Sequence, residues 1–273
     1  MKRGDVALKE EKQRAREQWG QDPCGEIYGR EHEFGTREFF DRVERHRYEE
    51  YAPWMPEVMG FNKFRGARLL EIGCGMGTDL LQFARGGARV TGADLTPRSV
   101  EISKKRFGLY GMAGEFVITD GERLPFRDES FDVVYSNGVL HHTPGTDAAI
   151  AEAHRVLRPG GIAKVMLYHR NSLAYWGELF FRRGLLSGEL LRGRSMSDVM
   201  SRWVEISSAD ARPLVKVYSR REALGLFSMF SRVETEIEQM TRPELRFLKH
   251  IPESLFRRLR RSIGWNVIIT ATK

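Results

Sequence analysis

Cysteine is scarce in this 273-residue chain, which contains only Cys24 and Cys74. The two lie far apart in unlike surroundings, and neither shows the spacing of a metal-ligand pair. A disulfide framework and a zinc site are therefore not expected. Little cysteine is also typical of proteins from a reducing cytoplasm, which is the location we predict.

Long hydrophobic runs and repeats are missing as well. No run approaches the roughly 20 apolar residues that cross a bilayer. Residues 1–16 are highly charged and lack the apolar centre of a signal peptide. These absences argue against a membrane-spanning protein and against a repeat protein. An apolar content of 41% still suffices for a sizeable core.

Basic residues, by contrast, are in excess, with a formal charge of +7 and a pI near 9.5. Such a charge attracts phosphate, but the basic clusters are scattered and no RNA-binding appendage is recognisable. A solvated basic surface is the simplest interpretation, followed by an anionic small substrate or membrane surface, and nucleic acid is the least favoured partner. The clusters lie at residues 104–106, 182–183, 220–221, 257–258 and 260–261.

The most informative stretch is residues 69–80, LLEIGCGMGTDL, a short apolar strand that runs into a glycine-dense turn and then a helix. Alternate glycines from Gly73 to Gly77 allow a tight turn and close approach of a ligand to the backbone. A dinucleotide fingerprint would place its third small residue at Thr78. Glu71, before the first glycine, instead suits a ligand that carries a cation, such as S-adenosylmethionine.

Further motifs follow in a fixed order, namely a strand ending in an acid, a strand with an acidic turn, a strand with a polar loop, a glycine turn and a fifth strand. They span residues 88–95, 115–126, 130–142, 155–161 and 162–168. With the glycine turn, they resemble the class I S-adenosylmethionine-dependent methyltransferases. The resemblance covers about a hundred residues and specifies the fold and cofactor more closely than the methyl acceptor.

The resemblance implies a role for each strand-terminal acid. Asp94 accepts hydrogen bonds from the ribose hydroxyls, and Asp120 accepts from the adenine amine. A simpler role as a turn former stays open for Asp120, because it precedes Gly121. The predicted cofactor-binding residues are Glu71, Gly73, Cys74, Gly75, Gly77, Asp94, Leu95, Asp120, Gly121 and Asn137.

Alternating strands and helices predict an α/β fold with helices on both faces of the sheet. The expected architecture is a doubly wound, seven-stranded, mostly parallel Rossmann-like sheet. Ser219 and Glu222 form a capping-box pattern that begins a helix, and a strand follows at residues 232–238. Residues 265–272 are rich in β-branched side chains and suit the antiparallel last strand of this family.

Four segments are expected along the chain. Residues 1–64 form an N-terminal helical lid, 65–170 the cofactor-binding core, 171–218 an inserted helical cap, and 219–273 the return to the core. The lid residues could equally pack on the sheet edge. The cap is unusually apolar, which also fits a packing helix or a homodimer interface.

A helix expected at residues 252–262 has an apolar stripe flanked by arginines. The stripe contains Leu255, Phe256, Leu259 and Ile263. A helix docked on the core is the favoured interpretation, and peripheral membrane contact is the alternative.

The sulfonium of S-adenosylmethionine is an activated methyl donor, so alignment with an O, N or C nucleophile does much of the work. Alignment supplies about 7–11 kcal/mol, and a positioned base about 10² to 10⁴ in rate. The loop at residues 141–144, HHTP, resembles that of ubiquinone- and menaquinone-biosynthesis methyltransferases, where it serves varied acceptors. The candidate catalytic residues, which follow the fourth and fifth strands, are His141, His142, Tyr168 and His169.

The sequence therefore predicts a methyltransferase acting on a small, partly apolar acceptor, with a natural product favoured. Quinone or lipid methylation, RNA methylation and a non-catalytic cofactor-binding module are the alternatives. Residues 136–139, SNGV, stand where many base-methylating enzymes carry an Asn-Pro-Pro-Tyr type motif. No metal dependence is expected, because the carboxylate cluster of the metal-dependent enzymes is not evident after the fourth strand.

Overall fold

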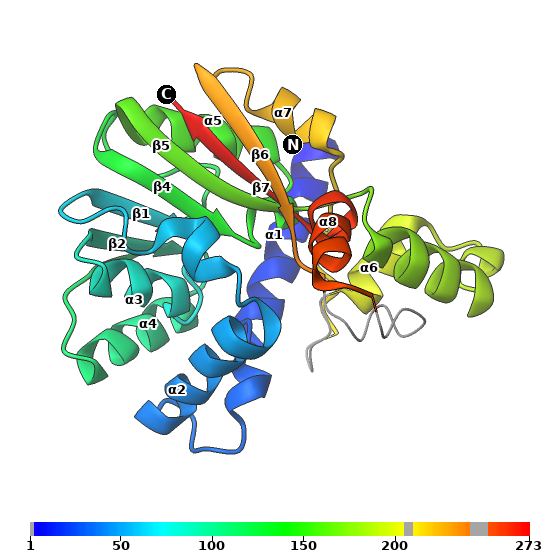
Figure 1. Ribbon diagram of the computed structural model, residues 1–273, viewed down its shortest axis with the longest axis horizontal. Coiled ribbons are helices and arrows are strands. Elements are labelled where there is room, and N and C mark those ends of the chain that lie inside the picture. The colour runs from blue at the N-terminus through cyan, green and yellow to red at the C-terminus, as the bar shows by residue number, and fades with distance from the viewer. Residues whose placement is uncertain (1–2, 205–209, 241–250) are drawn as a thin grey trace.

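A seven-stranded sheet forms the centre of the computed structural model, which describes residues 3–204, 210–240 and 251–273 (Figure 1). The strand order is β3-β2-β1-β4-β5-β7-β6, with β7 antiparallel to both neighbours and the other described pairs parallel. The predicted fold class is confirmed. The strands are β1 (Arg68–Ile72), β2 (Arg89–Asp94), β3 (Glu115–Ile118), β4 (Phe131–Asn137), β5 (Leu157–Tyr168), β6 (Arg232–Glu238) and β7 (Asn266–Thr272).

Helices cover both faces of this sheet (Figure 1). They are α3 (Thr78–Arg85), α4 (Pro97–Leu109), α5 (Thr146–Val156) and α7 (Arg220–Leu226). Successive side chains of a strand point to opposite faces, so Leu69 joins the cluster that holds Phe83 of α3. Leu70 joins the cluster that holds Ile150 of α5 and Ala223 of α7. The central strand β1 is therefore buried on both sides, as parallel strands in such folds are.

Residues 3–60 are mostly helical, and part of this segment packs against the glycine turn. The helices are α1 (Arg3–Gln21) and α2 (Arg37–Arg45), with helical turns at Glu26–Gly29, His46–Tyr51 and Pro56–Gly60. Thr36 caps α2 by accepting a hydrogen bond from the Phe39 amide. Phe39 and Phe40 are buried in one cluster with Met76 of the glycine turn and Ile102 of α4.

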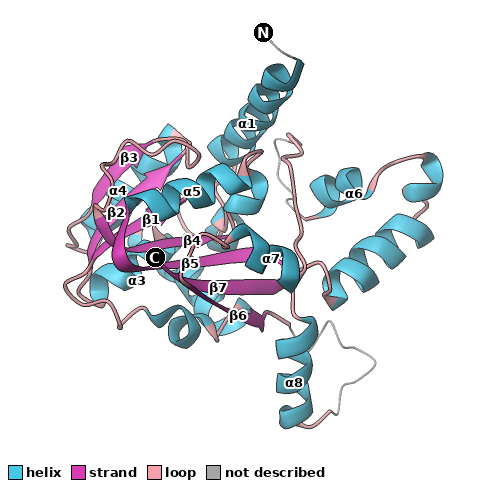
Figure 2. Ribbon diagram, turned by 90° about the horizontal axis from the view of Figure 1, so that it is seen from above, coloured by secondary structure: helices cyan, strands magenta, loops and turns pink. Residues whose placement is uncertain are grey.

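After β5, the chain leaves the sheet and forms a helical projection (Figures 1 and 2). It consists of a wide helix at Ala174–Leu186, a turn at Leu190–Arg192 and α6 (Met196–Trp203). Ile206, an apolar residue of the predicted cap, lies outside the described residues. The predicted capping box at Ser219 and Glu222 is present and begins α7.

The start of β5 differs from the sequence expectation, whereas the helix before β7 docks on the core as favoured. β5 begins at Leu157 rather than Ile162, because Leu157 already pairs with Phe131 of β4 before the register shifts and Ile162 pairs with Val133. α8 (Glu253–Ile263) packs on the core, since Phe256 is buried and the Arg260 guanidinium lies 2.7 Å from the Glu238 carboxylate. In the part of the chain described here, no helix has the length and apolar character needed to span a bilayer.

Candidate active site

A cavity of about 380 Å³ opens at the carboxyl ends of β1, β2 and β4, within the usual size of small-molecule sites. Every predicted cofactor-binding residue lines it except Gly77. Gly77 begins α3 with a φ of +69°, and a Cβ there would approach the Ser103 hydroxyl to 3.0 Å. Gly77 therefore permits the turn and its packing on α4.

The glycine turn has the shape that a ligand-binding backbone requires. Gly73 has a φ of +78°, and a Cβ there would lie 2.3 Å from Val139. Gly75 has a φ of +51°, and a Cβ there would meet nothing within 4 Å. Because Gly75 also lines the cavity, its backbone borders space that a ligand can fill.

Asp94 ends β2 and is held by three donors. Its carboxylate accepts from the Gly75 amide at 2.9 Å, the Thr96 amide at 2.9 Å and the Thr96 hydroxyl at 3.0 Å. Burial raises the pKa of Asp94, and the Thr96 and Gly75 hydrogen bonds oppose that rise. The carboxylate is thus fixed beside the glycine turn and retains lone pairs for further donors.

Two buried carboxylates, Glu71 and Asp79, form part of the cavity wall beside the N-terminal helical segment. Asp79 accepts from the Arg47 guanidinium at 2.6 and 2.7 Å, from Tyr48 at 2.6 Å and from Tyr135 at 2.8 Å. Burial alone would raise the pKa of Asp79, but Arg47 and the hydroxyl donors outweigh it and hold the pKa below its usual value.

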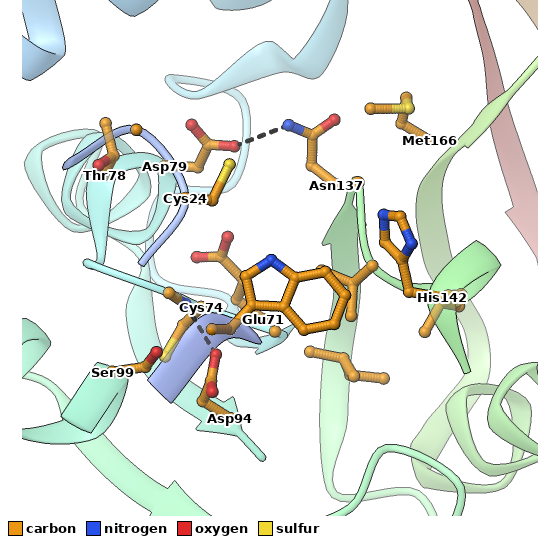
Figure 3. A pocket seen from close by; sticks show the side chains of 18 of the residues that line it. Cys24, Glu71, Cys74, Thr78, Asp79, Asp94, Ser99, Asn137, His142 and Met166 are labelled. Carbon is orange, nitrogen blue, oxygen red and sulfur yellow. Dashed lines mark hydrogen bonds between the residues drawn. The ribbon is translucent and has the colours of Figure 1, made fainter. Parts of the chain in front are cut away.

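For Glu71, burial outweighs the charge of Arg47 and the hydrogen bond from the Leu80 backbone, both of which lower its pKa. Its Oε2 is buried without a hydrogen-bond partner among the described residues, and burial, followed by the charge of Asp79, raises its pKa well above the ordinary value. Figure 3 shows Glu71 in the same pocket as Asp79 and Asn137, which are joined by a hydrogen bond of 3.3 Å. Two carboxylates face one guanidinium here, so this wall favours a cationic ligand group.

Asp120 of the cavity forms an ion pair with the N-terminal helix α1. The Lys12 ammonium of α1 lies 2.6 Å from Asp120 Oδ2 and 2.6 Å from Glu122 Oε2. Burial works against the charge of Lys12, but hydrogen bonds to the two carboxylates outweigh it and raise the Lys12 pKa. Near the carboxyl end of α1, Arg98 donates to the main-chain oxygen of Gln21 at 2.6 Å. The middle and the carboxyl end of α1 are therefore held to the core.

The four candidate catalytic residues divide into two pairs. His142 and Tyr168 line the cavity, whereas His141 and His169 do not. The His142 Nδ1 lies 2.8 Å from the Leu214 oxygen, and the ring lies 4.9 Å from that of Trp19.

The other two histidines lie in the interior. His141 is fully buried with neither ring nitrogen hydrogen-bonded in the described part of the chain, and burial lowers its pKa well below the usual value. The His169 Nδ1 lies 3.0 Å from the Gly264 oxygen, and burial lowers its pKa too. Neutral rings packed in the interior suit structural roles better than proton transfer at the cavity.

Sequence reasoning missed a further histidine. His46 lines the cavity, its Nδ1 lies 2.9 Å from Glu50 Oε2, and Tyr28 stacks on its ring at 3.5 Å. The His46 hydrogen bond lowers the pKa of Glu50, whose ionised carboxylate can only accept. The Nδ1 of His46 therefore carries the proton, and Nε2, which has no partner among the described residues, is a proton acceptor.

The lid also supplies an aromatic wall to the cavity. The ring-bearing residues of residues 1–64 that line it are Trp19, Tyr28, His46, Tyr51 and Trp54. The aromatic density of this segment was visible in the sequence, but which rings face the cavity depends on how the helices pack.

Metal binding has no candidate site in the described ranges. They contain no group of three or more His, Cys, Asp or Glu side chains that could hold a metal ion. The expectation of metal independence stays a prediction.

The sheet order, the glycine turn and the strand-terminal acid together define a class I S-adenosylmethionine-dependent methyltransferase domain. Residues 70–165 match the family model described as "Methyltransferase domain". The family predicted for this core is thereby confirmed.

Relatives of this chain include two methyltransferases with named acceptors. The phthiotriol/phenolphthiotriol dimycocerosates methyltransferase of Mycobacterium leprae is 38% identical over 147 residues, which are 50% of this chain and 54% of that protein. The ubiquinone biosynthesis O-methyltransferase of Cereibacter sphaeroides is 36% identical over 112 residues, which are 41% of this chain and 45% of that protein. The chain spans about half the length of these curated relatives.

Among solved structures, a methyltransferase from Methanosarcina mazei superimposes with a TM-score of 0.55. It is 18% identical and covers 80% of this chain and 97% of its own. At this identity the similarity establishes the fold alone.

Proposed function

We propose that this protein is an S-adenosylmethionine-dependent methyltransferase that methylates an O, N or C nucleophile of a small, partly apolar acceptor. The observation that carries the proposal is one cavity in which the glycine turn, Asp94 and the unpartnered Glu71 oxygen meet an aromatic wall. The first three suit a cationic nucleoside, and the aromatic wall suits an apolar acceptor.

The residues of the cavity fit the cofactor. In the proposed complex, the Asp94 carboxylate takes the ribose hydroxyls, Asp120 takes the adenine amine, and Glu71 compensates the positive charge at the methionine end. Asn137 adds a buried oxygen without a partner in the described ranges. When bound, S-adenosylmethionine supplies an activated methyl group and leaves as S-adenosylhomocysteine.

The aromatic wall excludes water from the acceptor and favours rings or chains over highly charged molecules. The names of the relatives refer to phthiotriol dimycocerosates and to ubiquinone biosynthesis. They support a lipid or quinone acceptor over another natural product, which had been favoured from the sequence. For a hydroxyl acceptor, we propose that His46 Nε2 receives the proton while Glu50 holds the ring.

We also propose the four-part organisation with a lid at residues 1–64, a core at 65–170, a cap at 171–218 and a return at 219–273. The lid residues that line the cavity and the Lys12 contacts support the first boundary. A cytoplasmic location is proposed on the scarcity of cysteine.

Calorimetry with S-adenosylmethionine tests the proposal. One-site binding is expected in the wild type and should weaken about 100-fold in Asp94→Ala, because two charge-assisted hydrogen bonds are lost. Asp147→Ala, an exposed acid on α5, is the matched control and should bind normally. No binding by the wild type would overturn the proposal. Binding without transfer of labelled methyl to any lipid, quinol or natural-product acceptor would favour the non-catalytic module.

A further inference from the structure

The helical projection after β5 has two unlike sides. On the inner side, Leu179 and Met200 are buried in one cluster with Val215 and Val217. On the outer side, four large apolar side chains are exposed, here called the cap stripe: Trp176 at 50%, Phe181 at 55%, Leu186 at 70% and Leu191 at 80%. Figures 1 and 2 both show this segment projecting away from the sheet.

The spacing of the cap stripe matches the helix that carries it. The helix at Ala174–Leu186 is of the wide type, in which hydrogen bonds join residues five apart. Trp176, Phe181 and Leu186 each follow the last by slightly more than one turn of such a helix, so they form an exposed stripe that drifts around it, and Leu191 lies in the next turn. Contiguous exposed apolar side chains of this size mark interaction surfaces in soluble proteins.

Arginines flank the cap stripe. Residues 171–204 contain five arginines against three carboxylates. Arg182, next to Phe181, pairs with Glu178, whereas Arg192, next to Leu191, donates to the main-chain oxygen of Ser187 at 3.1 Å. An apolar face bordered by arginine is the pattern of helices that lie in the headgroup region of an anionic bilayer.

The apolar stripe of α8, which the sequence suggested as an alternative membrane contact, is less exposed than the cap stripe. In α8, Phe256 is buried and packs with Leu259 and Ile263, so much of its apolar stripe faces the protein. Arg260 and Arg261 are directed to the buried Glu238 carboxylate.

The inner side of the projection reaches the cavity. Val204, at the end of α6, lines the cavity, and Tyr168 of the cavity packs against the same cluster as Leu179.

We propose that the cap stripe docks this protein on the surface of a bilayer that contains anionic lipid, with its four apolar side chains inserted among the headgroups. A second copy of the chain is a poorer occupant, because a two-fold contact would bring the arginines of one stripe against those of the other. This docking surface is separate from the cofactor site and goes beyond the proposed function.

Vesicle co-sedimentation of the full chain tests the docking. The vesicles consist of equal parts of phosphatidylcholine and phosphatidylglycerol, with pure phosphatidylcholine as the uncharged comparison. The wild type should bind the mixed vesicles, more weakly as salt rises. The double variant Phe181→Ser/Leu186→Ser should lose at least about tenfold in partitioning, because two apolar side chains no longer insert.

Matched controls separate this surface from others. Leu109→Ser and Met229→Ser alter apolar residues that are exposed elsewhere, and both should bind as the wild type does. Unchanged thermal melting of each variant shows that the fold is kept. The proposal would be overturned if the wild type did not bind vesicles, or if the double variant bound them as well as the wild type does. It would also be overturned if only Leu255→Ser of α8 lost binding. A wild-type dimer that the double variant converts to monomer, without vesicle binding, would overturn it in favour of a second copy.

Discussion

Asp79 is the most heavily bonded carboxylate of the site, although it was absent from the predicted binding residues. Its partners Arg47 and Tyr48 come from the lid, whereas Tyr135 and Asn137 come from β4. Because one carboxylate gathers donors from the lid and the sheet, it holds the lid on the cavity while also setting the charge of the cavity wall.

Replacing Asp79 by asparagine leaves the Arg47 guanidinium without its counter-charge. We expect Asp79→Asn to lower the free energy of unfolding by about 2–3 kcal/mol, below the range for fully buried pairs because Arg47 is partly exposed. Urea unfolding measures the change. Asp132→Asn is the control, since its partners Arg68 and Arg158 are more exposed, and it should cost no more than about 1 kcal/mol. Equal losses in the two variants would contradict the central role of Asp79.

The difference in unfolding free energy between the wild type and Asp79→Asn should change with pH in a defined direction. The folded-state pKa of Asp79 is lowered, so its stabilising contribution is complete above the unfolded value of about 3.9 and is lost as the pH falls through the folded value. The gap between wild type and Asp79→Asn should therefore stay constant between about pH 5 and 7 and narrow below about pH 4. A gap that widens in acid would contradict the assignment.

The proposed role of His46 as proton acceptor predicts a loss of turnover when this residue is replaced. With a hydroxyl acceptor, His46→Gln should lower kcat by about 10² or more while cofactor affinity stays within a few-fold, because the proton acceptor is lost and the binding groups remain. His142→Gln serves as the comparison, and a larger loss there would make His142 the base instead.

At the level of elements, α1 is a separate unit tied to the core at two places. Lys12 holds its middle to Asp120 and Glu122, and Arg98 holds its carboxyl end. Between these contacts, Ala15 and Gln18 are buried and the Trp19 ring lies 4.9 Å from that of His142, so packing and polar contacts together hold α1 over the cavity.

Replacing Lys12 tests whether its ion pairs hold α1 on the core. We expect Lys12→Met to raise amide hydrogen exchange in α1 about fivefold, which corresponds to about 1 kcal/mol for a partly buried ion pair. Lys104→Met, on the exposed side of α4, removes a lysine without these partners and should leave α1 unchanged. Exchange in α1 that is the same in both variants would show that Lys12 does not hold the helix.

The elements also show what the sequence could predict. The glycine turn and Asp94 follow from contiguous motifs whose geometry is local, and the sheet architecture followed from the family resemblance, so these were predictable from the sequence. Arg47 and His46 were not, because only the packing of the lid brings them to the cavity. The same limit applies to α8 and the cap, since both show apolar stripes flanked by arginine and only the tertiary structure decides which stripe is covered.

On the scale of the whole molecule, the cavity is closed by parts that are distant in the sequence. Residues of α1, the glycine turn, the loop after β4 and Val204 all line it. A ligand that fills the cavity contacts these parts together, so binding should stabilise the fold as a unit.

S-adenosylhomocysteine at about 100 times its dissociation constant should add about 2.7 kcal/mol to the free energy of unfolding by mass action. For a chain of this size, the melting temperature should rise by about 5–10 °C. Differential scanning fluorimetry measures the shift, and Asp94→Ala at the same ligand concentration should show little of it. An equal shift in Asp94→Ala would place the ligand elsewhere.

The position of β7 between β5 and β6 has a consequence for synthesis on the ribosome. β6 is made before β7 but joins the sheet only through it. Until residues 266–272 have been synthesised, the nascent chain exposes the unpaired edge of β5, and β6 has no strand on which to dock. The growing polypeptide therefore passes through a period in which two strand edges are open to wrong pairing, and chaperone contact during translation should concentrate there.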